Sequence, residues 1–209
     1  MRAIKQGCTG RERSMNPEEN SILAGSTLAA TSRTTRHLLL RAFEPGDVDR
    51  VHAIQRDSDA MQYTWVAPDL AATAAYLQSH AARRAGHGFA PWIAVLRSEQ
   101  RIVGYGGLYK DPAAPQWGTE VIYFLERSCW GRGLASEIVE ASLELAFTEL
   151  GLREVGAFAR PQNTRSVRVL AKAGFERVEF LEEFERDRFR IDAAKWRSRR
   201  LAVSTGASR

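Results

Sequence analysis

The spacing of hydrophobic and polar positions changes several times between residues 37 and 196, and each change marks an expected element. Short apolar runs, typical of strands, occupy residues 38–43, 92–96, 102–109, 120–125 and 155–159, and two further runs predict strands at 175–180 and 186–191. Apolar residues at helical spacing predict helices over about 48–54, 70–84, 134–150 and 164–173. The order β-α-α-β-β-β-α-β-α-β-β predicts one α/β domain with a mixed sheet.

The segment 120–150 contains the clearest of these patterns. Residues 120–125 are uniformly bulky, which predicts a central strand covered on both faces. The helix over 134–150 places apolar side chains on one face and four glutamates elsewhere. The apolar positions are Leu134, Ile138, Ala141 and Leu145, and the glutamates are Glu137, Glu140, Glu144 and Glu149.

The two ends of the chain lack this patterning. Residues 1–35 are rich in Ser, Thr, Ala, Gly and charged residues, so we expect a disordered leader, with order beginning at His37 and Met15 as an alternative start of translation. We assign residues 36–196 to one folded domain and residues 197–209 to a basic C-terminal tail.

The net charge of +5 comes from these ends. Residues 1–36 carry +3 and residues 195–209 carry +5, whereas residues 37–194 carry −3. A nucleic-acid binder usually concentrates positive charge on a folded face. We therefore interpret the basic ends as solvated and do not expect nucleic acid as a partner, although an RNA- or ribosome-associated role stays open on the ends alone.

The sequence contains no pattern typical of a membrane protein, an exported protein or a metal site. No apolar run approaches the roughly 20 residues of a membrane span, and the N-terminus has no continuous apolar segment typical of a signal peptide. Cys8 and Cys129 do not make a disulfide framework, so we expect a cytoplasmic location. The four histidines lack mutual metal-ligand spacing, and we expect no metal.

A glycine-rich loop, Trp130-Gly131-Arg132-Gly133-Leu134-Ala135, joins the strand at 120–125 to the helix at 134–150. Small residues allow a ligand to approach the backbone, and a helix N-terminus presents free N–H groups with partial positive charge, which suits a pyrophosphate. The spacing matches neither the Rossmann pattern nor a P-loop. Taken alone, a short glycine-rich loop is more often a tight turn than a phosphate site.

The residues around this loop extend the pattern. The run from Thr119 to Leu125 precedes it, and Asn163-Thr164-Arg165-Ser166, followed by Ala173-Gly174-Phe175, comes after the strand at 155–159. Together these motifs resemble the general N-acetyltransferase (GNAT) superfamily, particularly the branch related to ribosomal-protein N-terminal acetyltransferases. The resemblance runs from about His37 to Trp196 and is specific from Glu120 to Phe175. It implies the GNAT fold, with a mixed, mostly antiparallel central sheet flanked by helices, and acetyl-CoA as cosubstrate without a metal.

The resemblance also implies how the cofactor is bound. Backbone groups of the strand would pair with the pantetheine arm, the loop would hold the pyrophosphate, and Asn163 would meet the arm from the other side. Trp130 departs from the usual Arg or Gln of the superfamily motif, which removes one polar contact. The implied cofactor-binding residues are Tyr123, Phe124, Leu125, Trp130, Gly131, Arg132, Gly133, Leu134, Ala135, Ser136 and Asn163.

Two catalytic residues are implied in the same way. An amine must be neutral to attack a thioester, so a base should take its proton, and Glu120 occupies the position of the catalytic glutamate in several superfamily members. Its alternative role is a carboxylate in a solvated pair at the sheet edge. Superfamily members often use a late Tyr to protonate the thiolate, but no Tyr follows Tyr123. Ser166 is the substitute that the resembled branch suggests, and its alternative role is a first-turn helix serine bonded to the backbone.

The resemblance therefore implies transfer of acetyl from acetyl-CoA to a primary amine, either a small molecule or a protein N-terminus, by direct attack. Direct transfer needs no covalent enzyme intermediate, so we do not expect Cys129 to be catalytic. The alternative from another class is a non-catalytic GNAT-like module that senses an acyl-CoA. The sequence identifies neither the acceptor nor the oligomeric state, monomer or homodimer, because one fold supports many acceptors.

Overall fold

The computed structural model describes residues 32–111 and 114–206. Eight strands form one sheet: Ser32–Thr34 (β1), Leu38–Arg41 (β2), Trp92–Leu96 (β3), Arg101–Tyr109 (β4), Glu120–Leu125 (β5), Glu154–Ala159 (β6), Glu176–Leu181 (β7) and Arg186–Asp192 (β8). The main helices are Val48–Gln55 (α2), Leu70–His87 (α3), Leu134–Glu144 (α4), Thr164–Ala173 (α5) and Ala193–Gly206 (α6). The predicted element order from residue 38 to residue 191 is confirmed.

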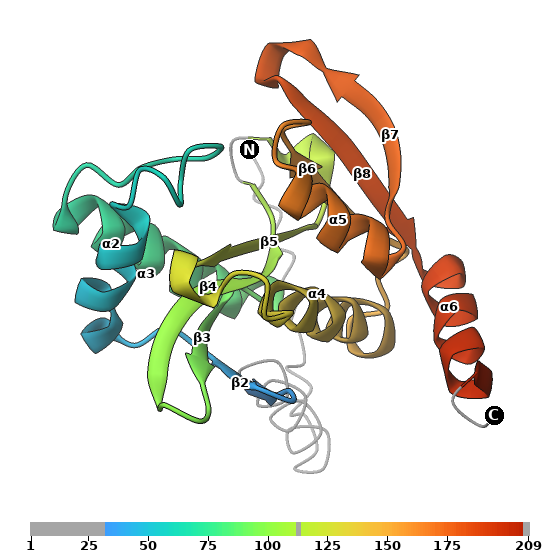
Figure 1. Cartoon of the computed structure of the whole chain (residues 1–209), viewed down its shortest axis with the longest axis horizontal. Helices are drawn as coiled ribbons and strands as arrows, with labels where there is room; N and C mark the ends of the chain where they lie inside the picture. Colours follow the sequence, from blue (N-terminus) through green and yellow to red (C-terminus); the bar gives the residue numbers. More distant parts are fainter. Residues whose placement is uncertain (1–31, 112–113, 207–209) are drawn as a thin grey trace, which may run out of the picture.

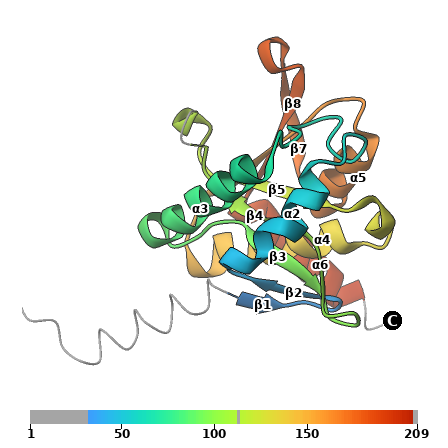
Figure 2. The same cartoon turned by 90° about the vertical axis from the view of Figure 1, so that its left-hand side faces the viewer.

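The sheet has the strand order β1-β2-β3-β4-β5-β6-β8-β7, so β5 is an interior strand, as its apolar pattern predicts. All neighbours pair antiparallel except β5 and β6. The predicted α/β class with a mostly antiparallel sheet flanked by helices is therefore confirmed. Helices cover both faces, with α2 and α3 on one and α4 and α5 on the other (Figures 1 and 2).

Each face of the sheet has its own apolar core. The larger core joins α4 and α5 to the sheet through fully buried side chains such as Ile138, Leu143 and Leu170. The smaller core packs Val51 of α2 and Leu77 of α3 on the opposite face. Alternation along a strand sends successive side chains to opposite faces, so each residue of β5 belongs to one of the two environments.

The predicted helix over 134–150 changes character before its end. Regular α-helix stops at Glu144, and Leu145–Glu149 forms one turn of π-helix, in which the amide of Leu150 bonds to the carbonyl of Leu145 at 3.0 Å. The wider turn keeps Leu145, Ala146 and Phe147 buried. Apolar periodicity could not show this change, because both helix types bury the same side chains here.

Both ends of the described chain carry more structure than the sequence predicts. The leader prediction for residues 1–31 lies outside the described residues, but residues 32–34 form β1, which pairs with β2. Residues 197–206, predicted as tail, continue α6, whose Trp196 is buried against Phe147.

The charges of these ends pair with the glutamates of α4 and of the π-helical turn. Arg33 pairs with Glu149, and Arg199 pairs with Glu140. These contacts correct the interpretation of the basic ends as solvated for Arg33 and Arg199, whereas Arg36 and Arg197 are exposed. Polar patterning alone cannot distinguish a solvated charge from one that meets a distant partner.

The feature that positions the site is the divergence of β5 and β6. These parallel strands pair at Glu120 and Gly156, and no further Cα pair is formed between them among the described residues. Beyond that pair the backbone groups of β5 on the β6 side have no strand partner. Among the same residues, no helix combines the length and low polarity needed to cross a lipid bilayer.

Candidate functional site

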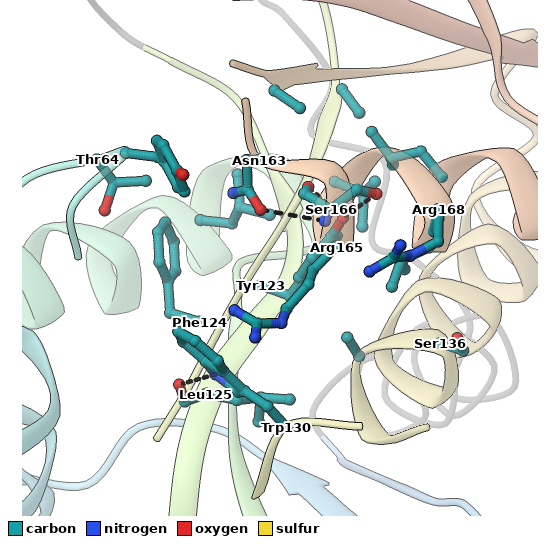
Figure 3. A pocket seen from close by; sticks show the side chains of 18 of the residues that line it. Thr64, Tyr123, Phe124, Leu125, Trp130, Ser136, Asn163, Arg165, Ser166 and Arg168 are labelled. Carbon is teal, nitrogen blue, oxygen red and sulfur yellow. Dashed lines mark hydrogen bonds between the residues drawn. The ribbon is translucent and has the colours of Figure 1, made fainter. Parts of the chain in front are cut away.

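A cavity of about 450 Å³ occupies the space where β5 and β6 separate (Figure 3). Such a volume is typical of small-molecule sites. Its walls come from both strands, the first turn of α4, much of α5, and residues 60–64. Twelve of the thirteen predicted site residues line it: Glu120, Tyr123, Phe124, Leu125, Trp130, Gly131, Gly133, Leu134, Ala135, Ser136, Asn163 and Ser166.

The thirteenth residue, Arg132, does not line this cavity. It lies in a separate surface depression, and its Nη1 approaches the sulfur of Cys129 at 3.7 Å. The assignment of Arg132 to the pyrophosphate therefore stays a prediction that concerns its place in the loop, because its side chain does not enter the cavity. The loop turns at glycines on both sides of Arg132, and this turn carries the side chain outward.

The start of α4 forms an open cradle for an anion. Gly131 and Gly133 have φ angles of 77° and 80°, in the left-handed region that glycine adopts without steric cost. Gly133 is the N-cap residue, and no side chain caps the helix. The first-turn N–H groups therefore lack intrahelical partners. A Cβ placed on Gly133 would meet no protein atom within 4 Å, so the space beside the backbone is open.

Trp130 supports this loop. Its indole Nε1 donates a hydrogen bond to the carbonyl oxygen of Leu125 at 2.9 Å, and the guanidinium of Arg165 lies 4.8 Å from its ring centroid (Figure 3). The residue that departs from the superfamily motif thus joins the loop to β5 and to α5. One carbonyl expected to meet the pantetheine arm, that of Leu125, is already bonded to Trp130.

Three basic residues of α5 line the cavity, and the sequence analysis missed all of them. Arg165, Arg168 and Lys172 lie three and four residues apart, so they share one helix face. None of them forms an ion pair with another residue in the described ranges. The signal was their spacing directly after the Asn163 motif, which predicts a basic stripe beginning at the cavity.

The first turn of α5 also brings two hydroxyl groups together. The Oδ1 of Asn163 accepts a hydrogen bond from the amide of Ser166 at 3.2 Å, so Asn163 caps the helix. The Oγ of Ser166 lies 2.7 Å from the hydroxyl oxygen of Tyr123 (Figure 3). Burial raises the pKa of Tyr123 to about 12, so its phenol stays protonated at neutral pH.

The hydroxyl of Tyr123 was not anticipated, because only its backbone was assigned a role. Strand alternation could have indicated its direction: Val121, Tyr123 and Leu125 share the face that α4 and α5 cover. The contact with Ser166, 43 residues away, follows from the packing of α5 against that face.

Glu120 lies at the point where β5 and β6 still pair, and 7% of its surface is exposed. Burial raises the pKa of its carboxyl to about 7; Asp111 adds to the rise, and Arg186 and Arg188 oppose it. It forms no ion pair within the described ranges. The alternative of a solvated pair at the sheet edge is therefore wrong, because β5 is interior and the carboxyl is buried.

The remaining candidates for chemistry do not form a site. Within residues 32–111 and 114–206, no three His, Cys, Asp or Glu side chains are placed to hold a metal ion. Cys129 is buried, and burial raises its thiol pKa, which disfavours the thiolate that a nucleophile requires.

Known proteins resemble this chain in sequence and in fold. The sequence model described as "Acetyltransferase (GNAT) domain" matches residues 37–176. An uncharacterized N-acetyltransferase of Bacillus subtilis (strain 168), YnaD, is 29% identical over 150 residues, which are 72% of this chain and 85% of that protein.

Solved structures share the fold. An acetyltransferase of the GNAT family from Bacillus anthracis superposes with a TM-score of 0.67 at 24% identity, over 78% of this chain and 99% of that chain. Spermidine N-acetyltransferase from Vibrio cholerae, solved in complex with CoA and spermine, gives a TM-score of 0.66 at 19% identity, over 78% and 99% of the two chains.

Proposed function

The chain belongs to the GNAT acetyltransferase family, and we propose that it transfers the acetyl group of acetyl-CoA directly to a primary amine. The observation that carries this proposal is a buried carboxyl with a pKa of about 7, held in the same cavity as an uncapped helix N-terminus. The helix N-terminus suits a diphosphate, and the carboxyl suits a proton acceptor.

The residues of the cavity fit coenzyme A. The open space beside Gly133 and the free N–H groups of α4 would receive the pyrophosphate. Arg165, Arg168 and Lys172 would neutralise its phosphate charges. The unpaired backbone side of β5 would accept the amide groups of an extended arm, as an added strand does. Acetyl-CoA would supply the acetyl group as a reactive thioester.

Glu120 would act on the amine side of the reaction. A base works best when its pKa lies near the operating pH, and a carboxyl with a pKa of about 7 is ionised in half of the molecules at pH 7. In this form it accepts the proton that the amine loses as the new C–N bond forms. An ordinary exposed glutamate would be a weaker base by more than two pKa units.

Ser166 and Tyr123 would act on the sulfur side. When the C–S bond breaks, the departing sulfur gains negative charge and needs a proton or a hydrogen bond. The two hydroxyl oxygens lie 2.7 Å apart, so Ser166 can donate toward the sulfur while Tyr123 donates to Ser166. Over the cycle an ammonium ion and the thioester become an amide, a free thiol and one proton released to solvent.

Thiol release from acetyl-CoA, measured with a panel of primary amines, tests the proposal. We expect turnover with at least one amine and a large loss in Ser166→Ala. Tight acetyl-CoA binding without turnover of any amine would favour the acyl-CoA sensor instead.

A further inference from the structure

The end of the cavity beside Glu120 has a charge pattern of its own. Glu120 is the single carboxylate among the described residues that line the cavity, whereas five lining residues are basic. Three of the five lie on α5, where the phosphates of coenzyme A would bind. The other two, Arg160 and Arg186, come from the other wall, beyond the paired ends of β6 and β8.

The strand register places these two arginines beside each other. The last pair between β6 and β8 joins Ala159 to Asp187; Arg160 directly follows the end of β6, and Arg186 is the first residue of β8. Gly156 pairs with Glu120 on one side and with Arg190 on the other, and alternation along β8 puts Arg190 and Arg186 on the same face of the sheet. Glu120 and Arg186 therefore face the same side, opposite to Tyr123, and Arg160 lines the same cavity.

The guanidinium of Arg186 is half-buried but has no partner. It makes no hydrogen bond or ion pair with any residue in the described ranges. Its pKa is lowered by burial and by the charge of Arg160, and raised by Glu120. Nε of Arg160 is also buried without a hydrogen-bond partner, while its Nη1 pairs with Glu185 at 2.6 Å.

Arg188, two residues along the same strand, has the kind of partners that Arg186 lacks. It pairs with Glu179 at 2.9 Å, and its guanidinium lies 4.9 Å from the ring centroid of Trp117. A buried, unbonded donor on Arg160 beside the unpaired, half-buried guanidinium of Arg186 is costly in the absence of an anion. A carboxylate matches the planar donor fork of arginine and would satisfy both side chains.

From this arrangement we infer that the acceptor is a free amino acid, bound with its carboxylate at Arg186 and Arg160 and its amine at Glu120. The inference rests on the proposed acetyl transfer and names its substrate class. A polyamine fits poorly, because it would bring several positive charges to the end of the cavity that holds two arginines and one carboxylate. A protein N-terminus also lacks the carboxylate beside its amine.

The test compares amine acceptors that carry this carboxylate with acceptors that lack it. Thiol release from acetyl-CoA is measured with the twenty standard amino acids, their C-terminal amides, a blocked tripeptide amide and spermidine. We expect the best amino acid to exceed its own amide at least tenfold in kcat/KM. Equal or better turnover of the amide, the tripeptide or spermidine would overturn the inference.

Arg186→Gln should reduce the preference for the acid over its amide to nearly one. The matched control is Arg190→Gln, on the same strand and face, because Arg190 pairs with Glu154 and does not line the cavity. The control should keep the wild-type preference. Equal loss of acid and amide turnover in Arg186→Gln would show a structural role and contradict the assignment.

Binding supplies a readout independent of turnover. Calorimetry in the presence of CoA should show that the N-acetyl amino acid binds at least tenfold more weakly to Arg186→Gln, and that N-acetyl amino acid amides bind weakly to both proteins. If no amine is turned over but this difference appears, the proposed reaction fails and the carboxylate site stands. Turnover of amines without a preference for the carboxylate would overturn the carboxylate site and leave the proposed acetyl transfer intact. Equal binding of the N-acetyl amino acid to the wild type and to Arg186→Gln would do the same.

Discussion

Replacing Glu120 by Gln should stabilise the protein at alkaline pH while it slows the reaction. The substitution keeps the size of the side chain and removes the carboxyl that titrates. Burial raises its pKa from 4.5 to about 7, a rise that disfavours the ionised form in the folded state. At about 1.4 kcal/mol per pKa unit, the ionised carboxylate costs about 3 kcal/mol of folding free energy.

The pH at which this cost appears follows from the direction of the shift. Between pH 4.5 and 7 the folded protein holds a proton that the unfolded chain has released, so stability falls as the pH rises through this window. Below pH 4.5 both states are protonated, and above pH 7 the full cost is present. Between pH 5.5 and 8.5 the wild type should therefore lose about 2 kcal/mol relative to Glu120→Gln.

Urea unfolding of both proteins at both pH values measures this quantity. The difference in unfolding free energy between the two proteins is compared at pH 5.5 and at pH 8.5, which cancels any pH-independent effect of the glutamine. Glu183→Gln is the control, because Glu183 is exposed and its substitution removes the same formal charge. If the gap between wild type and Glu120→Gln is the same at both pH values, burial does not raise the pKa of Glu120, and the electrostatic argument for the base fails.

The kinetics provide the second half of the test. We expect Glu120→Gln to lower turnover by roughly 10²-fold at neutral pH. The loss should shrink as the pH rises, because more of the amine then arrives without its proton. Wild-type kcat/KM should rise through a pKa near 7 that the variant lacks. A loss of rate that does not vary with pH would argue against a base at this position.

Four further substitutions test the cofactor end, the sulfur side and the C-terminal helix. Gly133→Ala should weaken acetyl-CoA binding, measured by calorimetry, at least tenfold, which is about 1.4 kcal/mol. The control is Gly88→Ala, because Gly88 has a similar left-handed φ of 76° but lies outside the cavity. This control should lose similar stability and keep the wild-type affinity. Ser166→Ala should lower turnover at every pH, and Tyr123→Phe should lower it less, because Ser166 keeps its own hydroxyl; equal losses from pH 6 to 9 would contradict the assigned order. Trp196→Ala should reduce the unfolding free energy by about 3–5 kcal/mol in urea, since the indole is buried against the domain, and an unchanged midpoint would show that α6 does not dock.

Local patterns were sufficient to predict the elements, and the resemblance to the GNAT superfamily added most of the residues that line the cavity. The bulky run of β5, the glycines before α4 and the Asn163 cap of α5 each act over a few neighbouring residues. Strand period, backbone freedom at glycine and helix capping depend on such short segments. The site residues followed from the resemblance to the GNAT superfamily, and twelve of the thirteen lie in one cavity. The exception, Arg132, depended on the direction of a side chain within a turn.

Contacts between distant segments could not be read from these patterns. The pairing of Arg33 with Glu149 spans 116 residues, and the sequence shows each partner only as a charged residue at a polar position. A polar face has the same periodicity whether water or an opposite charge covers it. The strand β1 and the continuation of α6 past Trp196 are therefore visible only after folding.

The sequence by itself determined the order of elements, the central strand and the loop positions where a ligand can approach the protein backbone. These properties follow from hydrophobic periodicity, side-chain size and the presence of glycine. Tertiary structure decided the chemistry of the site. The divergence of β5 from β6 opens the cavity, burial sets the pKa of Glu120, and packing of α5 brings Ser166 to Tyr123. Solvent exposure and charge neighbours are properties of the folded chain, and both depend on residues that lie far apart in the sequence.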